Sequence, residues 1–164
     1  MQRTWSRLSG RVVRVGDFHS VTRVFTQADV NTFATLIGDC NPIHLDVAAA
    51  KKAGFPNTIC HGVLVGSLFS NIMGMHLPGE QSVYLQQNFQ FVAPVFVGEE
   101  VTATVRVREF HREKKMLWLD TIVSKKNTKE GGPDVTCIQG TALGLNKTLQ
   151  LEGESPWTFV RPKM

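Results

Sequence analysis

The chain has 164 residues, a formal net charge of +4 and 42% hydrophobic residues. This length is typical of one domain whose core is large enough to fold without stabilising cross-links. Because the sequence contains no run of about 18 apolar residues, it offers no candidate transmembrane helix. The cysteines at 40, 60 and 137 are odd in number, widely spaced and outside any C-x-x-C pattern. We therefore expect a reducing compartment and no metal site.

The start of the chain is basic. Four arginines precede the first acidic residue, Asp17: Arg3, Arg7, Arg11 and Arg14. A segment rich in Arg, containing Ser and lacking acids is typical of a mitochondrial transit peptide, and a solvated tail without a targeting role is the alternative. The sequence thus predicts a basic segment at 1–16 that targets the protein to the mitochondrial matrix, one domain at 17–150 and a C-terminal tail at 151–164.

The first half of the chain alternates between strand and helix patterns. A strand is expected at 18–25. Thr26 is a candidate N-cap, with Asp29 three residues later as in a capping box, and together they predict a helix that Gly38 ends. A short second helix is expected to begin at Asp46 and to close at residue 54.

The second half combines one apolar helix with a run of strands. The helix, 62–75, is apolar nearly all round, so other elements must enclose it. Beyond it the pattern changes to period two, which predicts strands. These strands are expected at 83–92, 100–110, 116–124 and 135–145. The order predicts an α+β fold in which one curved antiparallel sheet wraps around the long buried helix.

The most informative segment runs from Gly38 to His44, with the sequence G-D-C-N-P-I-H. Asp39 and His44 lie five residues apart, and the Asn41-Pro42 pair breaks the helix and fixes the backbone between them. A carboxylate and an imidazole held in this way can share one water or substrate atom as general acid and base. The alternative is that Asp39 caps a turn and His44 is a buried, satisfied imidazole.

A second segment, Cys60-His61-Gly62-Val63, begins the apolar helix. Backbone amides at the start of a helix are free and lie at the positive end of its dipole, so Gly62 could hold a thioester oxygen that gains enolate charge. His61 is expected to cap or pack rather than to act as a third catalytic group. Ser70 is expected either to bond back to the helix or to orient the acid or imidazole. Cys40 has no cationic neighbour to activate it and is expected to pack.

The motif G-D-x-N-P-x-H, followed about eighteen residues later by H-G-x-L, resembles the MaoC-like, (R)-specific enoyl-thioester hydratase family, which has the hot-dog fold. The resemblance runs from about Asp17 to Leu145 and includes Leu68-Phe69-Ser70, Leu77-Pro78-Gly79 and the segment 94–101. With the basic N-terminal segment, it is strongest to the mitochondrial 3-hydroxyacyl-thioester dehydratases of type 2. Ile37 departs from the family, which more often has Ser or Thr there.

The resemblance implies an enzyme that reversibly dehydrates (R)-3-hydroxyacyl thioesters. It implies that Asp39 and His44 are the catalytic dyad, that the Gly62 amide forms the oxyanion hole, and that Asn41 and Ser70 support the site. It further implies a substrate carried on coenzyme A or on acyl carrier protein, a homodimer, and no metal or other cofactor. No nucleic-acid module is present in the sequence, so no such partner is expected.

Two other functions remain open from the sequence. A hot-dog thioesterase uses a carboxylate to activate water at the carbonyl and needs no imidazole at the β-carbon. A non-catalytic acyl-binding module needs neither group.

The hydratase function raises the question of which carrier holds the acyl chain. The basic loop residues Arg112, Lys114 and Lys115 suit the acidic surface of an acyl carrier protein.

Overall fold

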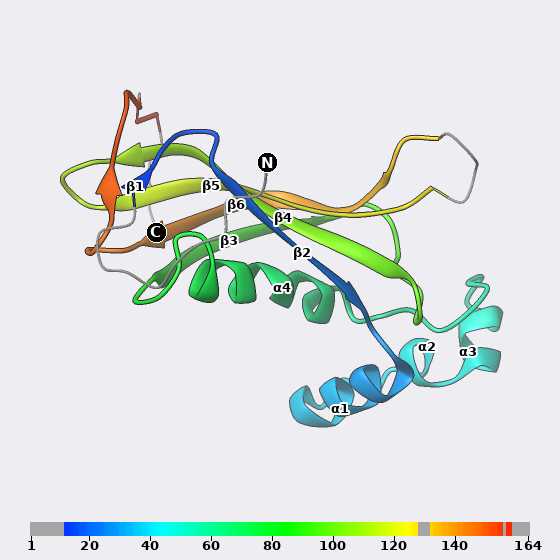
Figure 1. Ribbon diagram of the computed structural model, residues 1–164. Helices are drawn as coiled ribbons and strands as arrows, with labels where there is room; N and C mark the ends of the chain where they lie inside the picture. Colours follow the sequence, from blue (N-terminus) through cyan, green and yellow to red (C-terminus); the bar gives the residue numbers. More distant parts are fainter. Residues whose placement is uncertain (1–11, 128–131, 156, 159–164) are drawn as a thin grey trace.

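The computed structural model describes residues 12–127, 132–155 and 157–158. Five strands form one antiparallel sheet in the order β2-β4-β5-β6-β3. The strands are β2 (Phe18–Val24), β3 (Val83–Phe91), β4 (Glu100–His111), β5 (Met116–Lys125) and β6 (Val135–Leu145). Helix α4 (Gly62–Met75) lies along one face of this sheet (Figure 1). The predicted α+β hot-dog architecture is therefore confirmed.

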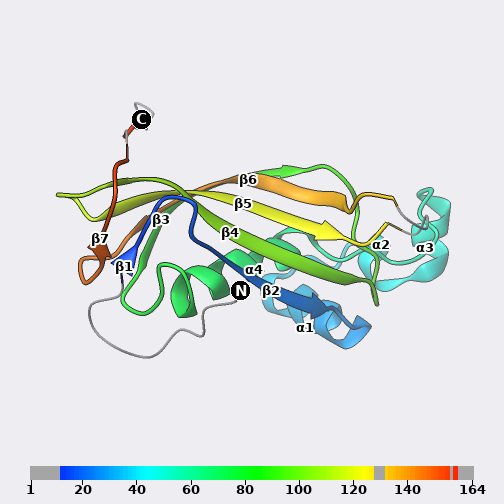
Figure 2. The ribbon, with the colours of Figure 1, turned by 45° about the horizontal axis from the view of Figure 1, so that its top comes forward.

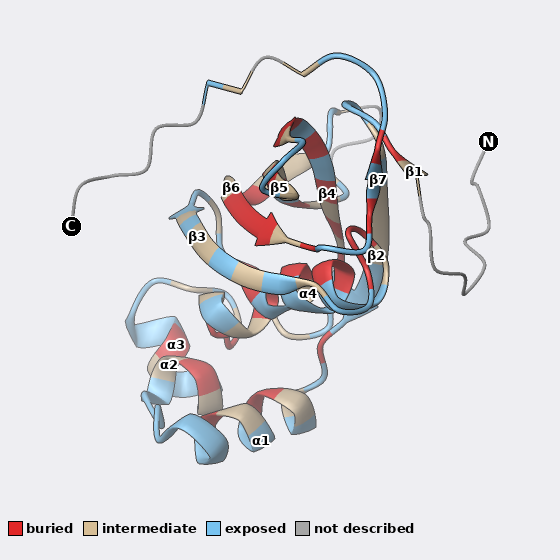
Figure 3. Cartoon of the chain, turned by 90° about the vertical axis from the view of Figure 1, so that its left-hand side faces the viewer, coloured by how far each residue is buried: buried red, intermediate tan, exposed pale blue. Residues whose placement is uncertain are grey.

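The core lies between α4 and the sheet. Phe69 and Ile72 on α4 are fully buried, and Figure 3 shows the buried side of α4 turned toward the strands. The opposite side of α4 is open, since Val63 is 56% and Met75 60% exposed. The helix predicted to be enclosed all round is thus covered on one side only within this chain.

Three short helices form a separate group beyond the end of the sheet, beside the start of α4 (Figures 1 and 2). They are α1 (Gln27–Ile37), α2 (Pro42–Leu45) and α3 (Val47–Lys52). The predicted capping box is present, and Gly38 ends α1 in the left-handed conformation at φ 78°, which glycine adopts without strain. The short helix predicted to begin at Asp46 is present as α3, and Asp46 is its N-cap: the Asp46 carboxylate accepts a hydrogen bond from the backbone amide of Ala49.

Helix α2 was not predicted. Pro42 was expected to break helical structure, yet it occupies the first turn of α2, and Asn41 is the N-cap. Proline is well placed in the first turn because the amide that it lacks would have no helical partner there. The segment between Asp39 and His44 is therefore a helix start rather than a simple turn.

The fold extends beyond the expected limits of 17–150 at both ends. Strand β1 (Val12–Val13) pairs in parallel with β7 (Gln150–Leu151), and Val13 and Leu151 belong to the buried core. The buried carboxylate of Glu109 accepts hydrogen bonds from the amide and hydroxyl of Thr158. Most of the predicted transit peptide, residues 1–11, lies outside the described residues. In the part of the chain that the structure describes, no helix is long and apolar enough to span a membrane.

Candidate active site

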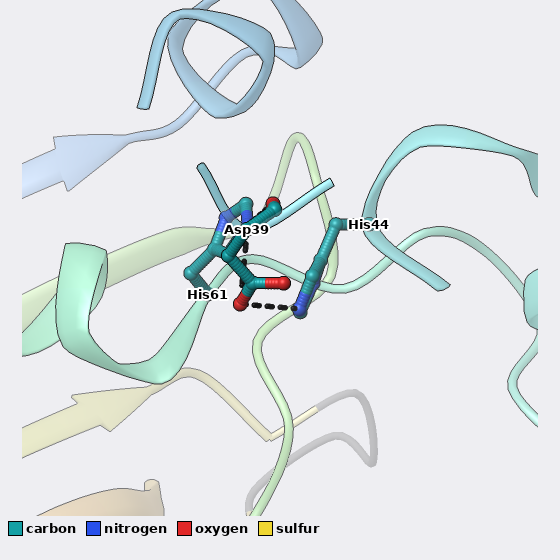
Figure 4. Close-up of side chains that lie close together, drawn as sticks. All are labelled: Asp39, His44 and His61. Atoms are coloured by element: carbon teal, nitrogen blue, oxygen red, sulfur yellow. Dashed lines mark hydrogen bonds and ion pairs between the residues drawn. The ribbon is translucent and has the colours of Figure 1, made fainter. Parts of the chain in front are cut away.

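Three side chains from separate elements meet beside the start of α4 (Figure 4). Asp39 follows the end of α1, His44 lies on α2, and His61 immediately precedes α4. The Asp39 Oδ2 atom is 4.0 Å from His44 Nε2 and 3.9 Å from His61 Nε2. The predicted pair is thus brought together. The Asp39 side chain is half exposed, whereas both imidazoles are buried.

The backbone fixes the protonation pattern of His44. Its Nδ1 lies 2.7 Å from the carbonyl oxygen of Ile59. Because a carbonyl oxygen only accepts, Nδ1 carries the proton, and in the neutral ring Nε2 is left as a base. This nitrogen is the one that faces the Asp39 carboxylate.

Asn41 connects the two predicted catalytic groups. Its side-chain oxygen accepts a hydrogen bond from the Ile43 amide and so caps α2, which carries His44. Its backbone N–H donates to Asp39 Oδ1 over 3.3 Å. One residue therefore contacts the carboxylate and begins the helix that carries the imidazole.

Gln27 and Thr58 hold the backbone of His44 in place through hydrogen bonds, and neither residue was singled out from the sequence. The Gln27 amide nitrogen donates to the backbone carbonyl of His44 over 2.9 Å, and its amide oxygen accepts from the Thr58 hydroxyl over 2.9 Å. Thr58 is only 1% exposed. These contacts join residues 17 and 31 positions apart, and no local sequence pattern signals them.

His61 packs against both members of the pair. Its ring is stacked on His44 with 3.8 Å between the centroids, and its Nε2 lies 3.0 Å from the backbone carbonyl oxygen of Asp39. It makes no side-chain cap for α4. His61 occupies the N-cap position of α4 without a side-chain cap bond, so the expectation that it caps or packs is met by packing.

His44 and Gly62 line one apolar cavity of about 390 Å³, whose other walls include Phe91, Val65 and Ile138. The side chain of the N-cap residue His61 makes no cap hydrogen bond to α4, so it leaves the amides of the first turn free of such a bond. The Phe91 ring lies against Gly62, where an added Cβ would come within 2.5 Å of the ring. Asp39 is not among the residues that line this cavity.

Ser70 does not join this group within the chain. It is exposed on α4, eight residues after Gly62, which is about 12 Å along the helix axis. Among the described residues, neither a hydrogen bond to the acid or imidazole nor a back-bond to the helix is present at Ser70. The back-bond occurs one turn earlier instead, where the Ser67 hydroxyl donates to the Leu64 carbonyl over 2.6 Å.

The cysteines near the site do not have the setting of nucleophiles. Cys60 lines the cavity, and burial raises the pKa of its thiol to about 12, so the thiol stays protonated at neutral pH. Cys40 was expected to pack, yet it is exposed. Its sulfur lies 4.0 Å from the Ala34 carbonyl at the end of α1.

Asp39, His44 and His61 also have the residue types of a metal site, with candidate ligand atoms within 4.8 Å of one another. The geometry fits such a site poorly. A metal lies in the plane of each imidazole that binds it, whereas these two rings are stacked with 28° between their planes. The His61 Nε2 is also engaged with a carbonyl oxygen. The arrangement suits proton transfer better than metal binding.

Comparison with known proteins identifies the family. The MaoC like domain matches residues 14–129. The chain belongs to the MaoC-like family. The matched region contains the segment 39–62 that forms the site, so the cluster of Asp39, His44 and His61 lies within the family's domain.

Individual proteins similar to this chain support the assignment to the family. The chain is 43% identical over 114 residues to an (R)-specific enoyl-CoA hydratase of Aeromonas caviae, covering 70% of this chain and 85% of that one. It is 34% identical over 157 residues to a mitochondrial 3-hydroxyacyl-[acyl-carrier-protein] dehydratase of Arabidopsis thaliana, covering 94% and 90%. The solved structure of the Aeromonas caviae (R)-hydratase superposes with a TM-score of 0.74 at 39% identity, covering 81% and 96%.

Proposed function

We propose that this chain is a hydro-lyase that interconverts (R)-3-hydroxyacyl thioesters and trans-2-enoyl thioesters. The observation that carries the proposal is the Asp39 carboxylate 4.0 Å from the basic Nε2 of His44, where His44 and Gly62 share an apolar cavity. An acid–base pair, an oxyanion donor and an apolar space for an acyl chain are what the reaction requires. The names of the similar hydratases and dehydratases support it.

In the dehydration direction, one member of the dyad removes the proton on the α-carbon of the thioester. The electrons move toward the thioester oxygen, and the Gly62 amide stabilises the charge there. As the double bond forms, the C–O bond at the β-carbon breaks, and the hydroxyl leaves with a proton as water. The dyad ends in its starting protonation state, because the proton taken from carbon departs with the product.

The thioesterase and the binding module are separated from the hydratase by one assay. Crotonyl-CoA is incubated with the full chain while the absorbance of the conjugated thioester and free thiol are both followed. Loss of absorbance without free thiol, with (R)-3-hydroxybutyryl-CoA as the product, supports the proposal. Release of free thiol indicates a thioesterase, and no change in either signal indicates a binding module, so both results contradict the proposal.

The proposed substrate is carried on acyl carrier protein or coenzyme A. The predicted docking residues give little support to the carrier protein, because the Arg112 guanidinium donates to the carbonyls of Leu151 and Gly153, and Lys115 donates to the Leu149 carbonyl. The turn between β4 and β5, which carries these residues, also lies at the opposite end of the molecule from α1–α3 (Figure 1). Hydration rates with crotonyl-CoA and crotonyl-acyl carrier protein, compared directly, decide between the carriers.

We propose that the chain forms a homodimer through the open side of α4 and the edge strand β3. Both surfaces are apolar, with Val63 56%, Met75 60%, Val83 50% and Leu85 46% exposed. An uncovered sheet edge with exposed apolar residues favours pairing with another chain. Sedimentation equilibrium gives the mass in solution: twice the chain mass of 18.2 kDa is expected, and a monomer contradicts the proposal.

We propose a mitochondrial location. Two points support it: the basic composition of residues 1–16 and the mitochondrial designation of the Arabidopsis relative. A reporter fused to residues 1–16 is expected to enter isolated mitochondria. A matched fusion with Arg3, Arg7, Arg11 and Arg14 changed to Gln is expected to stay outside. Equal import of both fusions, or of neither, contradicts the proposal.

A further inference from the structure

His61 combines deep burial with an unpaired polar atom. Its side chain is 3% exposed, and Nδ1 is a buried side-chain nitrogen without a hydrogen-bond partner among the described residues. A buried polar atom left unpaired destabilises a fold. A phenyl ring would fill the same space, between the His44 ring and the edge-on ring of Phe33 at 5.3 Å, without that cost. Packing alone therefore does not account for an imidazole here.

The polar atom that does form a bond is Nε2. It lies 3.0 Å from the backbone carbonyl oxygen of Asp39. Because this oxygen accepts, Nε2 carries the proton, and Nδ1 is the unprotonated nitrogen. Asp39 lies on the exposed connection between α1 and α2. Within the described residues its carboxylate accepts one hydrogen bond, from the backbone amide of Asn41 over 3.3 Å. The bond from His61 anchors the backbone of Asp39 to α4.

The same residue reaches all three parts of the site. Its side chain bonds Asp39 and stacks on His44, and its backbone leads directly into Gly62, the first residue of α4. We infer that His61 is a positioning residue: its Nε2–H bond to the Asp39 backbone carbonyl fixes the position of the Asp39 carboxylate relative to His44 and Gly62. This inference rests on the proposed hydratase function.

The test compares two replacements of His61. His61→Phe keeps a ring and loses the donor, whereas His61→Gln loses the ring and keeps an amide nitrogen near the position of Nε2. For crotonyl-CoA hydration, we expect His61→Phe to lower kcat by roughly tenfold to a hundredfold, with KM within twofold of wild type and an equal or higher melting temperature. We expect His61→Gln to recover most of the lost kcat.

Two results would overturn the inference: wild-type kcat in His61→Phe, or equal losses in both variants. A separate measurement does not depend on either variant folding. Nitrogen-15 spectra of the wild-type protein at neutral pH are expected to show the His61 ring protonated at Nε2, and protonation at Nδ1 alone contradicts the bond. If wild-type protein does not hydrate crotonyl-CoA, the proposed function fails, whereas the spectra still report on the bond.

Discussion

Replacing Gly62 with alanine should lower kcat strongly while leaving the fold intact. The added Cβ would lie 2.5 Å from Cε1 and 2.8 Å from Cδ1 of Phe91. Phe91 is 57% exposed, so its ring can turn away. Alanine is also favoured over glycine by about 1 kcal/mol in a helix interior, and part of this preference applies at Gly62, the first residue of α4. The two effects offset each other, and we expect the free energy of unfolding to change by no more than about 1 kcal/mol.

The catalytic effect of Gly62→Ala is expected to be much larger. The methyl group would occupy the cavity wall beside the amide that is proposed to bind the thioester oxygen. Alanine keeps the backbone N–H, but its methyl group would hold the thioester oxygen away from that N–H. The loss of one such hydrogen bond costs about 2.7–4 kcal/mol in the transition state, or roughly a hundredfold to a thousandfold in kcat. The assay is the initial rate of crotonyl-CoA hydration, measured together with the melting temperature.

Gly66→Ala is the matched control one turn along the same helix. Its Cβ would lie 2.9 Å from Cζ of Phe89, whose ring packs against the core. Overfilling a packed core costs about 1–3 kcal/mol, so this variant should lose stability and keep most of its kcat. If Gly62→Ala retains wild-type kcat, or if both variants lose kcat equally, the assignment of the oxyanion hole to Gly62 is wrong.

Three further predictions concern single side chains. At pH 8, a thiol reagent is expected to modify Cys40 quickly and the buried Cys60 and Cys137 slowly; fast modification of all three would contradict the burial. Because the folded-state pKa of Cys60 is raised from 9.0 to about 12, its thiol contributes stability below pH 9 that is lost as pH rises from about 9 toward 12. Chemical denaturation should show a smaller loss over that range in Cys60→Val, and identical slopes would refute the prediction. Gln27→Leu removes the two 2.9 Å hydrogen bonds of the Gln27 side chain, to the His44 carbonyl and from the Thr58 hydroxyl. We expect the free energy of unfolding to fall by about 1–3 kcal/mol and kcat to fall with it. Unchanged values of both would contradict a role for these bonds in holding His44.

Local signals predicted much of this fold. The capping box of Thr26 and Asp29 and the left-handed Gly38 depend on residues within a few positions of each other. The strands of the five-stranded sheet followed from alternating patterns, and their ends agree with the structure to within two residues, whereas β1 and β7 were not predicted. The acid and imidazole were found for the same reason, because one short motif holds them.

The features that were missed depend on contacts between distant segments. The stack of His61 on His44 joins the start of α4 to α2. The hydrogen bond between Gln27 and Thr58 joins residues that are 31 positions apart in the sequence. Helix α2 was missed because Pro42 is compatible with both a helix start and a helix break. No pattern in a single sequence distinguishes such outcomes, since the packing of other segments decides them.

The central claim is that Asp39 and His44 form an acid–base dyad. It is tested most directly by the kcat of Asp39→Asn for crotonyl-CoA hydration. The Asp39 side chain is 49% exposed, and the amide has nearly the same shape, so the variant should keep the wild-type melting temperature. We predict that kcat falls by roughly two or more orders of magnitude. A folded Asp39→Asn protein with kcat within threefold of wild type would contradict the mechanism.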